Sequence, residues 1–200
     1  MNDQPESVLD FWFGPPGSAA EVAGRQRKLW FGKSPENDRR VIEQFADTLR
    51  AATTGQLDHW ATTPHGRLAL VIVLDQFPHH VHRDQPSAFA TDPQALALSL
   101  AALAEDEHQS LAPIERVFLY LPLEHAESDA MQDLSVSLYE KLARDAPANE
   151  RALFNDFLDY ARRHRDVVAR FGRFPHRNAI LGRPSSVEEL EFLPQPGSRF

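Results

Sequence analysis

Apolar residues recur every three or four positions along most of the chain, which is the spacing of one helix face. Val41, Ile42, Phe45 and Leu49 follow this pattern, and leucines repeat in the same way over residues 96–103. Capping residues and prolines precede several of these stretches, as is typical of helix starts. Helices are therefore predicted over about residues 7–13, 19–31, 34–55, 91–103, 113–121, 124–144, 149–171 and from 184 onward.

The segment from Pro64 to Phe77 is compatible with two structures. Its three β-branched residues, 71–73, favour a buried strand. Thr63 in a capping position, Pro64 at the first helical position and the length of the segment favour a buried helix instead.

Short loops between successive helices predict antiparallel pairs. With 200 residues and no Gly/Ser-rich linker, the chain is expected to form a single all-helical domain over residues 1–200. Helix pairs stacked into a layer, as in tetratricopeptide proteins, fit this pattern. No strict 34-residue repeat is present, so the expected likeness is one of fold rather than of consensus.

The composition is that of a folded globular protein, with 42% hydrophobic and 10% aromatic residues. The absence of cysteine excludes disulfides, zinc–thiolate sites, iron–sulfur clusters and cysteine nucleophiles. An acidic, polar N-terminus does not resemble a signal peptide. Because the longest apolar run, Leu68–Leu74, is too short to span a bilayer, a cytoplasmic protein without membrane contact is expected.

Charge is distributed unevenly along the chain. The formal net charge of −8 argues against nucleic-acid binding. Residues 167–187 nevertheless contain no Asp or Glu and include four arginines. Such a cationic segment suits an anionic small ligand or an acidic partner surface. Alternatively, the arginines pair with carboxylates elsewhere in the fold.

A Phe-Pro-His step occurs twice, at residues 77–79 (the first step) and 174–176 (the second step). Proline restricts the preceding residue and lacks a backbone donor, so each step is expected to end a helix and to aim polar side chains into a cleft. Asp75 before the first step needs a partner if it is buried, and Arg173 or Arg177 would suit it. The candidate binding residues are Asp75, Glu127, Arg173, His176, Arg177 and Asn178.

Glu124 and His125 follow a proline and are expected to open a helix, with Glu124 and Glu127 on one face. A Glu or His here can act as a general base. The alternative is that the acidic residues only interact with the helix dipole. No metal is predicted: the chain has no His-Glu-x-x-His motif, and clustered histidines in a surface turn, such as residues 79–82, commonly have no function.

His164 lies on an otherwise apolar stripe with Ala161 and Val168. It is either a satisfied core residue or, if it borders a pocket, a group whose protonation state burial can tune. Tyr160, one turn earlier, is a possible neighbour. The catalytic candidates are Glu124, His125 and His164.

Four longer motifs occur in order: residues 11–14 (Phe-Trp-Phe-Gly), 74–78 (Leu-Asp-Gln-Phe-Pro), 118–125 (Phe-Leu-Tyr-Leu-Pro-Leu-Glu-His) and 170–178 (Arg-Phe-Gly-Arg-Phe-Pro-His-Arg-Asn). Together they resemble the bacterial domain of unknown function 924 family over about residues 7–193. The resemblance implies an all-α fold similar to the tetratricopeptide-like superfamily and brings no established activity. Ala126 stands where the family usually has Ser, so no catalytic hydroxyl is expected there.

The leading interpretation is a helical protein whose polar pocket binds an anionic or polar small molecule, either as a cofactor-independent hydrolase or as another acid–base enzyme. No cofactor is expected, and the protein is expected to be a monomer or a homodimer. The competing interpretation is a protein–protein interaction module in which the charged motifs are structural. Convergence of Glu124, His125 and Arg177 would favour the ligand site.

Overall fold

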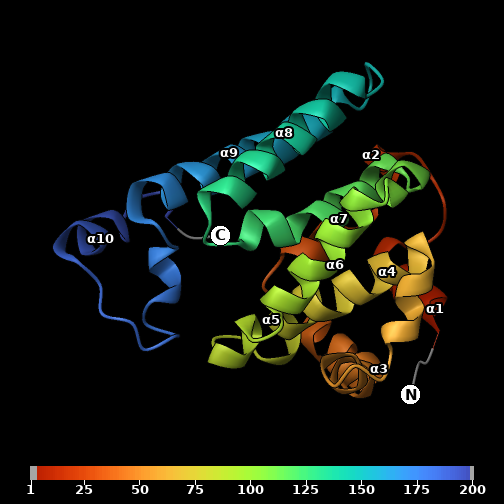
Figure 1. Cartoon of the computed structure of the whole chain (residues 1–200), viewed down its shortest axis with the longest axis horizontal. Helices are drawn as coiled ribbons and strands as arrows, with labels where there is room; N and C mark the ends of the chain where they lie inside the picture. Colours follow the sequence, from red (N-terminus) through yellow and green to blue (C-terminus); the bar gives the residue numbers. More distant parts are fainter. Residues whose placement is uncertain (1–3, 199–200) are drawn as a thin grey trace. The chain divides into compact units, whose positions relative to one another are not determined.

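The computed structural model describes residues 4–198, and within this range the chain is helical and contains no strand. This confirms the all-α prediction. The described residues form two compact units (Figure 1). Unit 1 contains residues 4–83 and 87–122, and unit 2 contains residues 84–86 and 123–198. Whether the units belong to one domain, as the sequence suggests, stays a prediction.

Unit 1 is built from helices α1 to α6 and the first part of α7. Short 3-10 helices at Asp58–Thr62, Pro86–Phe89 and Glu107–Ser110 connect them. The helices are α1 (Pro5–Phe13), α2 (Ala19–Phe31), α3 (Pro35–Thr53), α4 (Pro64–Val71), α5 (Phe77–Val81), α6 (Asp92–Ala104) and α7 (Pro113–His125).

The core of unit 1 is aromatic. Trp12 is fully buried against Phe77 and Phe118, with ring centroids 5.8 and 5.5 Å away. Trp30 packs on Phe118 at 4.6 Å, and its indole N–H donates to the Trp12 carbonyl at 2.9 Å. Trp12 and Trp30 therefore belong to the core of unit 1.

The uncertain segment from Pro64 to Phe77 is a buried helix. The Thr63 hydroxyl accepts from the Gly66 N–H at 3.1 Å and caps α4 as predicted. Residues 72–76 then form a π-helical turn in which the Phe77 N–H donates to the Ile72 carbonyl. The first step does not end a helix, contrary to expectation, because Pro78 sits in the first turn of α5, where no intrahelical N–H bond is required.

Helix α7 continues through Pro122 to His125, so the prediction that Pro122 ends a helix and Glu124 opens the next one is wrong. A proline inside a helix costs about 3 kcal/mol. Leu121 and Leu123 are buried on either side, at about 2 kcal/mol each, which is enough to offset that cost. Glu124 therefore lies at a helix C-terminus, and the dipole interpretation of this residue fails.

Unit 2 is built on one antiparallel helix pair, α8 (Asp129–Asp145) and α9 (Arg151–Phe171), which lie side by side in Figure 1. Polar and small residues join Val136 and Tyr139 on the buried face of α8. Gly172 ends α9 in the left-handed conformation (φ 68°), which glycine adopts without strain. A 3-10 turn at Pro175–Arg177 and α10 (Val187–Phe192) follow. A larger tetratricopeptide-like array stays a prediction.

Candidate functional site

A buried carboxylate–imidazole pair joins the end of α7 to the middle of α9. Glu124 and His164 are 3% and 5% exposed, and Glu124 Oε1 lies 3.0 Å from His164 Nδ1. Burying either group is costly unless the other satisfies it. His164 also lies 2.9 Å, through the same Nδ1, from the Tyr160 carbonyl oxygen. Tyr160 is thus a neighbour of His164 through its backbone, while its side chain is 47% exposed.

These contacts define the tautomer of the neutral His164 ring. A backbone carbonyl can only accept a hydrogen bond, so Nδ1 carries the hydrogen that lies between Tyr160 and Glu124. The other nitrogen, Nε2, then carries the lone pair. A carboxylate that holds Nδ1–H of a histidine in this way orients Nε2 as a base.

The Phe174 ring of the second step is the hub of a cationic and imidazole cluster. The His164 ring meets it edge to face at 5.5 Å, and the His176 ring lies at 5.7 Å. The Arg177 guanidinium lies over the same ring, 4.7 Å from its centroid. His125 extends the cluster, with its ring 6.3 Å from that of His164.

The environment keeps His176 neutral. Burial, and after it the positive charge of Arg177, lowers the pKa of His176 to about 3. The ring can therefore donate or accept a hydrogen bond at neutral pH but carries no charge there. Arg177, itself buried, is the permanent cation beside it.

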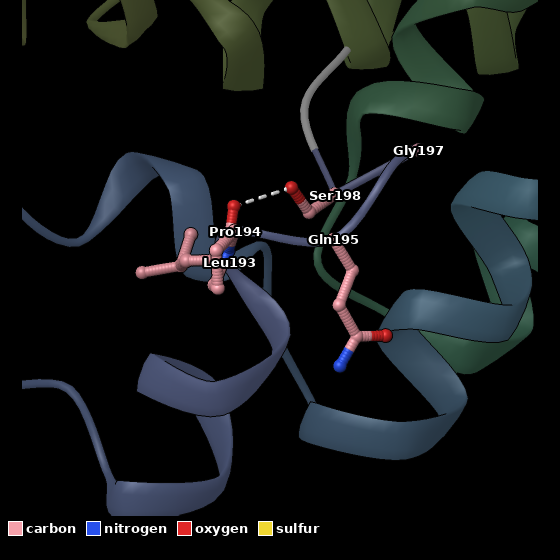
Figure 2. A pocket seen from close by; sticks show the side chains of 5 residues that line it. All are labelled: Leu193, Pro194, Gln195, Gly197 and Ser198. Carbon is pink, nitrogen blue, oxygen red and sulfur yellow. Dashed lines mark hydrogen bonds between the residues drawn. The ribbon is translucent and has the colours of Figure 1, made fainter.

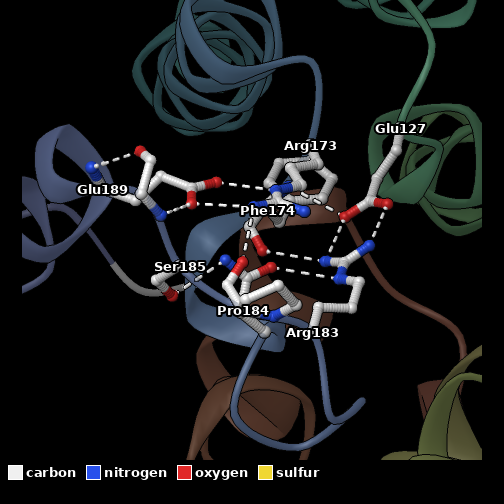
Figure 3. A network of polar contacts seen from close by, with 9 residues as sticks. Glu127, Arg173, Phe174, Arg183, Pro184, Ser185 and Glu189 are labelled. Carbon is white, nitrogen blue, oxygen red and sulfur yellow. Dashed lines mark hydrogen bonds and ion pairs between the residues drawn. The ribbon is translucent and has the colours of Figure 1, made fainter.

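Glu127 holds the backbone of the second step in place (Figure 3). Its carboxylate accepts two hydrogen bonds from Arg183, at 2.6 and 2.9 Å, and one from the Phe174 N–H at 2.8 Å. Arg183 also donates to the Phe174 carbonyl at 3.2 Å. Burial alone would raise the pKa of Glu127, but the bonds from Arg183 and Phe174 lower it. We call this unit the Glu127–Arg183 clasp.

A second charged pair fixes the segment that leads to α10. Arg173 donates to both carboxylate oxygens of Glu189, at 2.7 and 2.8 Å, and to the Pro184 carbonyl at 2.9 Å (Figure 3). Glu189 also completes a capping box with Ser186. The hydrogen bond from Arg173 is the main cause that lowers the pKa of Glu189 to about 2. Arg173 is thus committed to a structural partner.

The residues that directly follow the first step form an ion pair with helix α3 of unit 1. Asp38, in the first turn of α3, receives two bonds from Arg83, at 2.8 and 2.5 Å, and lies 2.8 Å from His80 Nδ1. Burial alone would raise the pKa of Asp38, but the bonds from Arg83 and His80 lower it. Burial lowers the pKa of His80. The charges here have partners from within the unit.

Comparison with known proteins identifies the family of this chain. The family model described as a bacterial protein of unknown function (DUF924) matches residues 8–197. The chain belongs to the DUF924 family. A solved structure of a protein of unknown function from Agrobacterium tumefaciens resembles it at 35% identity and a TM-score of 0.79, over 94% of this chain and 96% of that chain. No curated protein matches the chain.

Most of the predicted site residues of this DUF924 chain lie in unit 2. The cluster around Phe174 contains His164, His176 and Arg177, with Glu124 and His125 attached through His164. Asn178 is engaged elsewhere: its amide donates to Ser185 and accepts from Arg183, each at 3.0 Å.

Asp75 belongs to unit 1, where it accepts a bond from Gln76 at 2.6 Å. Its pairing with Arg173 or Arg177 stays a prediction. Among residues 4–198, no three His, Cys, Asp or Glu side chains are grouped as metal ligands, and no helix is both long and apolar enough to cross a membrane.

Two contributors escaped sequence reasoning. Arg183 completes the clasp; its only signal was its place in the acid-free segment. Gln132 donates to the carbonyls of Glu124 and Ala126, at 2.6 and 2.8 Å, and holds the end of α7. Gln132 could have been found from the sequence because it is a polar residue on the apolar stripe of α8.

An open depression lies near the end of the described chain (Figure 2). Its volume is about 340 Å³, and the Ser198 hydroxyl donates to the Leu193 carbonyl on its edge at 2.7 Å. None of the predicted site residues lines it. The lining residues are Leu193, Pro194, Gln195, Gly197 and Ser198.

Proposed function

We propose that this DUF924 protein binds an anionic or polar small molecule beside Phe174 and acts on it as a cofactor-independent acid–base enzyme, in the simplest case a hydrolase. The observation that carries the proposal is the buried Glu124–His164 pair, in which the carboxylate faces Nδ1 of the ring. A pair of apolar residues would fill the same space at no loss of stability. The ionisable pair is therefore better explained by chemistry than by folding.

Each member of the cluster has a distinct role in this proposal. His164 is the general base, and Glu124 positions it and stabilises its protonated form. Arg177 supplies the fixed positive charge for an anionic group. His125, half-buried at the end of α7, is the candidate proton donor to the leaving group.

The hydrolytic step balances with water as the nucleophile. His164 Nε2 takes a proton from water as the water oxygen forms a bond to the electrophilic carbon or phosphorus of the substrate. The bond to the leaving group breaks, and the leaving group takes a proton from His125 or from the protonated His164. No cofactor is consumed in this sequence.

The test is a hydrolysis assay on a panel of phosphate monoesters and carboxylic esters, with His164→Asn, Glu124→Gln and the control His59→Asn, an exposed histidine of unit 1. We expect about 1,000-fold lower kcat/KM in His164→Asn, and about 10- to 100-fold lower in Glu124→Gln. Hydrolysis that survives in His164→Asn, or no hydrolysis of any panel member, contradicts the proposal.

A further inference from the structure

The buried face of α8 carries two polar atoms that have no hydrogen-bond partner within the described chain. They are Gln132 Oε1 and Ser135 Oγ, and both residues are 0% exposed. Most buried polar groups in proteins have a partner, and each exception calls for an explanation. The two residues lie three apart, so they point from the same side of the helix.

The orientation of the Gln132 amide follows from its donors. Its nitrogen lies 2.6 Å from the Glu124 carbonyl oxygen and 2.8 Å from that of Ala126. Because both neighbours are acceptors, the atom between them is the NH₂ group. The amide oxygen must therefore face away from the end of α7, with its lone pairs available to another donor.

The Gln132 side chain is linked to the proposed base through Glu124. Gln132 bonds to the backbone of Glu124, and the Glu124 side chain bonds to His164. Ser135 follows one turn later on the buried face of α8, and α8 packs against α9, the helix that carries His164. Gln132 is thus bonded directly to a member of the Glu124–His164 pair, and Ser135 lies one turn further along the same helix face.

A purely structural role explains Ser135 poorly. An alanine at this place would remove a buried hydroxyl without a partner and would also favour the helix. Residues that lower stability in this way are typical of binding and catalytic sites.

We propose that Gln132 Oε1 and Ser135 Oγ bind a hydroxyl group of the substrate, and that the substrate is a small hydroxylated anion, such as a sugar phosphate or a sugar acid. This inference rests on the proposed function, because Arg177 is to bind the anionic end. Both atoms are uncharged acceptors, and the serine can also donate. They match a neutral hydroxyl better than an ammonium group, which is costly to bury without a charged partner, and the amide oxygen of Gln132 repels a carboxylate.

The experiment compares ligand-induced thermal stabilisation of the full chain in wild type, in Ser135→Ala and in Ser137→Ala, an exposed control on the same helix. The probes are glucose 6-phosphate and gluconate as hydroxylated anions, inorganic phosphate and acetate as anions alone, and glycine as an amino acid. Without probes, we expect Ser135→Ala to melt about 3 °C above wild type. Ser137→Ala should match wild type.

With probes, at least one hydroxylated anion should stabilise wild type more than the anions alone. Ser135→Ala should bind that probe about 10-fold more weakly and bind inorganic phosphate or acetate as wild type does. Equal stabilisation by all anions, or equal binding to wild type and Ser135→Ala, overturns this inference and leaves the proposed acid–base site standing. Stabilisation by glycine above the other probes, or a Ser135→Ala variant less stable than wild type, also overturns it. If no probe stabilises the wild type, this inference is overturned. The proposed function is then judged separately, by whether any ester of the hydrolysis panel is cleaved.

Discussion

The two Phe-Pro-His steps have similar sequences but different surroundings. The first step lies within a continuous buried helical segment, and its charged neighbours are tied together: Asp38 bonds to both His80 and Arg83. The second step follows the end of α9, and its Phe174 ring carries two imidazoles and a guanidinium around it.

The two steps differ in how their ionisable groups are arranged. At the first step the carboxylate, the imidazole and the guanidinium satisfy one another, which is the behaviour of a structural ion pair. At the second step the Glu127–Arg183 clasp holds the backbone, while the adjacent Glu124–His164 pair places a carboxylate against Nδ1 of a buried ring. Similar sequence motifs thus lie beside a structural ion pair in one unit and beside the proposed acid–base site in the other.

Removal of Asp38, the carboxylate that pairs with the residues after the first step, should have the largest effect on stability. Asp38→Ala leaves a buried histidine and an arginine without their carboxylate, and we expect a loss of about 3 kcal/mol. Urea unfolding measures it, with Asp47→Ala as control, because the Asp47–Arg50 pair is exposed on the same helix and should contribute no more than about 0.5 kcal/mol. A loss no larger than that of the control would show that the first step has no structural ion pair.

Acidification should destabilise the protein through its buried histidines. The pKa of His176 is about 3 in the folded chain and about 6.5 in an unfolded one, so only the unfolded state takes up the proton between these values. The stability from the neutral ring is present above pH 6.5 and is lost progressively below it, by roughly 3 kcal/mol at pH 4.5.

Urea unfolding of wild type and His176→Asn at pH 6.5, 5.5 and 4.5 tests this effect. The variant should lose less stability over the range. Some loss should remain, because burial lowers the pKa of His80 as well. Equal slopes for the two proteins would contradict the account of His176.

Breaking the clasp should cost somewhat less than breaking the first step, because its side chains are a quarter exposed. Glu127→Ala removes the partner of Arg183 and of the Phe174 N–H, and we expect a loss of about 2 kcal/mol. Glu140→Ala, which breaks an exposed pair with Arg162 in the same unit, is the control and should change stability by about 0.5 kcal/mol or less. Equal losses in the two variants would argue against the clasp.

The smallest effect should come from the glycine that ends α9 before the second step. Gly172→Ala forces a side chain into a left-handed conformation, although the added carbon meets no atom within 4 Å, and should cost about 1 kcal/mol. Gly24→Ala, in a helix interior with equally open space, should instead leave stability unchanged or raise it by about 1 kcal/mol. Melting temperatures that move in the same direction in both variants would contradict this account.

Local signals in the sequence predicted the helix starts well. The caps at Ser34, Thr63 and Ser186 form within a few residues, so the bonds that make them are visible in the sequence itself. Pro122 misled the prediction for the opposite reason: whether a helix continues through a proline depends on burial of its neighbours, which only the fold decides.

The site was predictable only in part. His164 and Glu124 stood out because one is polar on an apolar stripe and the other follows a long apolar run. Their pairing, and that of Glu127 with Arg183, joins residues 40 and more positions apart, which spacing along one helix cannot reveal. Ser135 looks like an ordinary helix residue until its burial is known.

We infer that Glu124 and the Tyr160 carbonyl hold Nδ1 of His164, so that Nε2 is the basic nitrogen of the ring. A long-range ¹H–¹⁵N correlation spectrum of the histidine rings at pH 8, assigned with His164→Asn, reads this directly. The account predicts a hydrogen on Nδ1 and a lone pair on Nε2 of His164, and a ring whose Nδ1 signal shifts in Glu124→Gln. A hydrogen on Nε2, with Nδ1 bare, would contradict it.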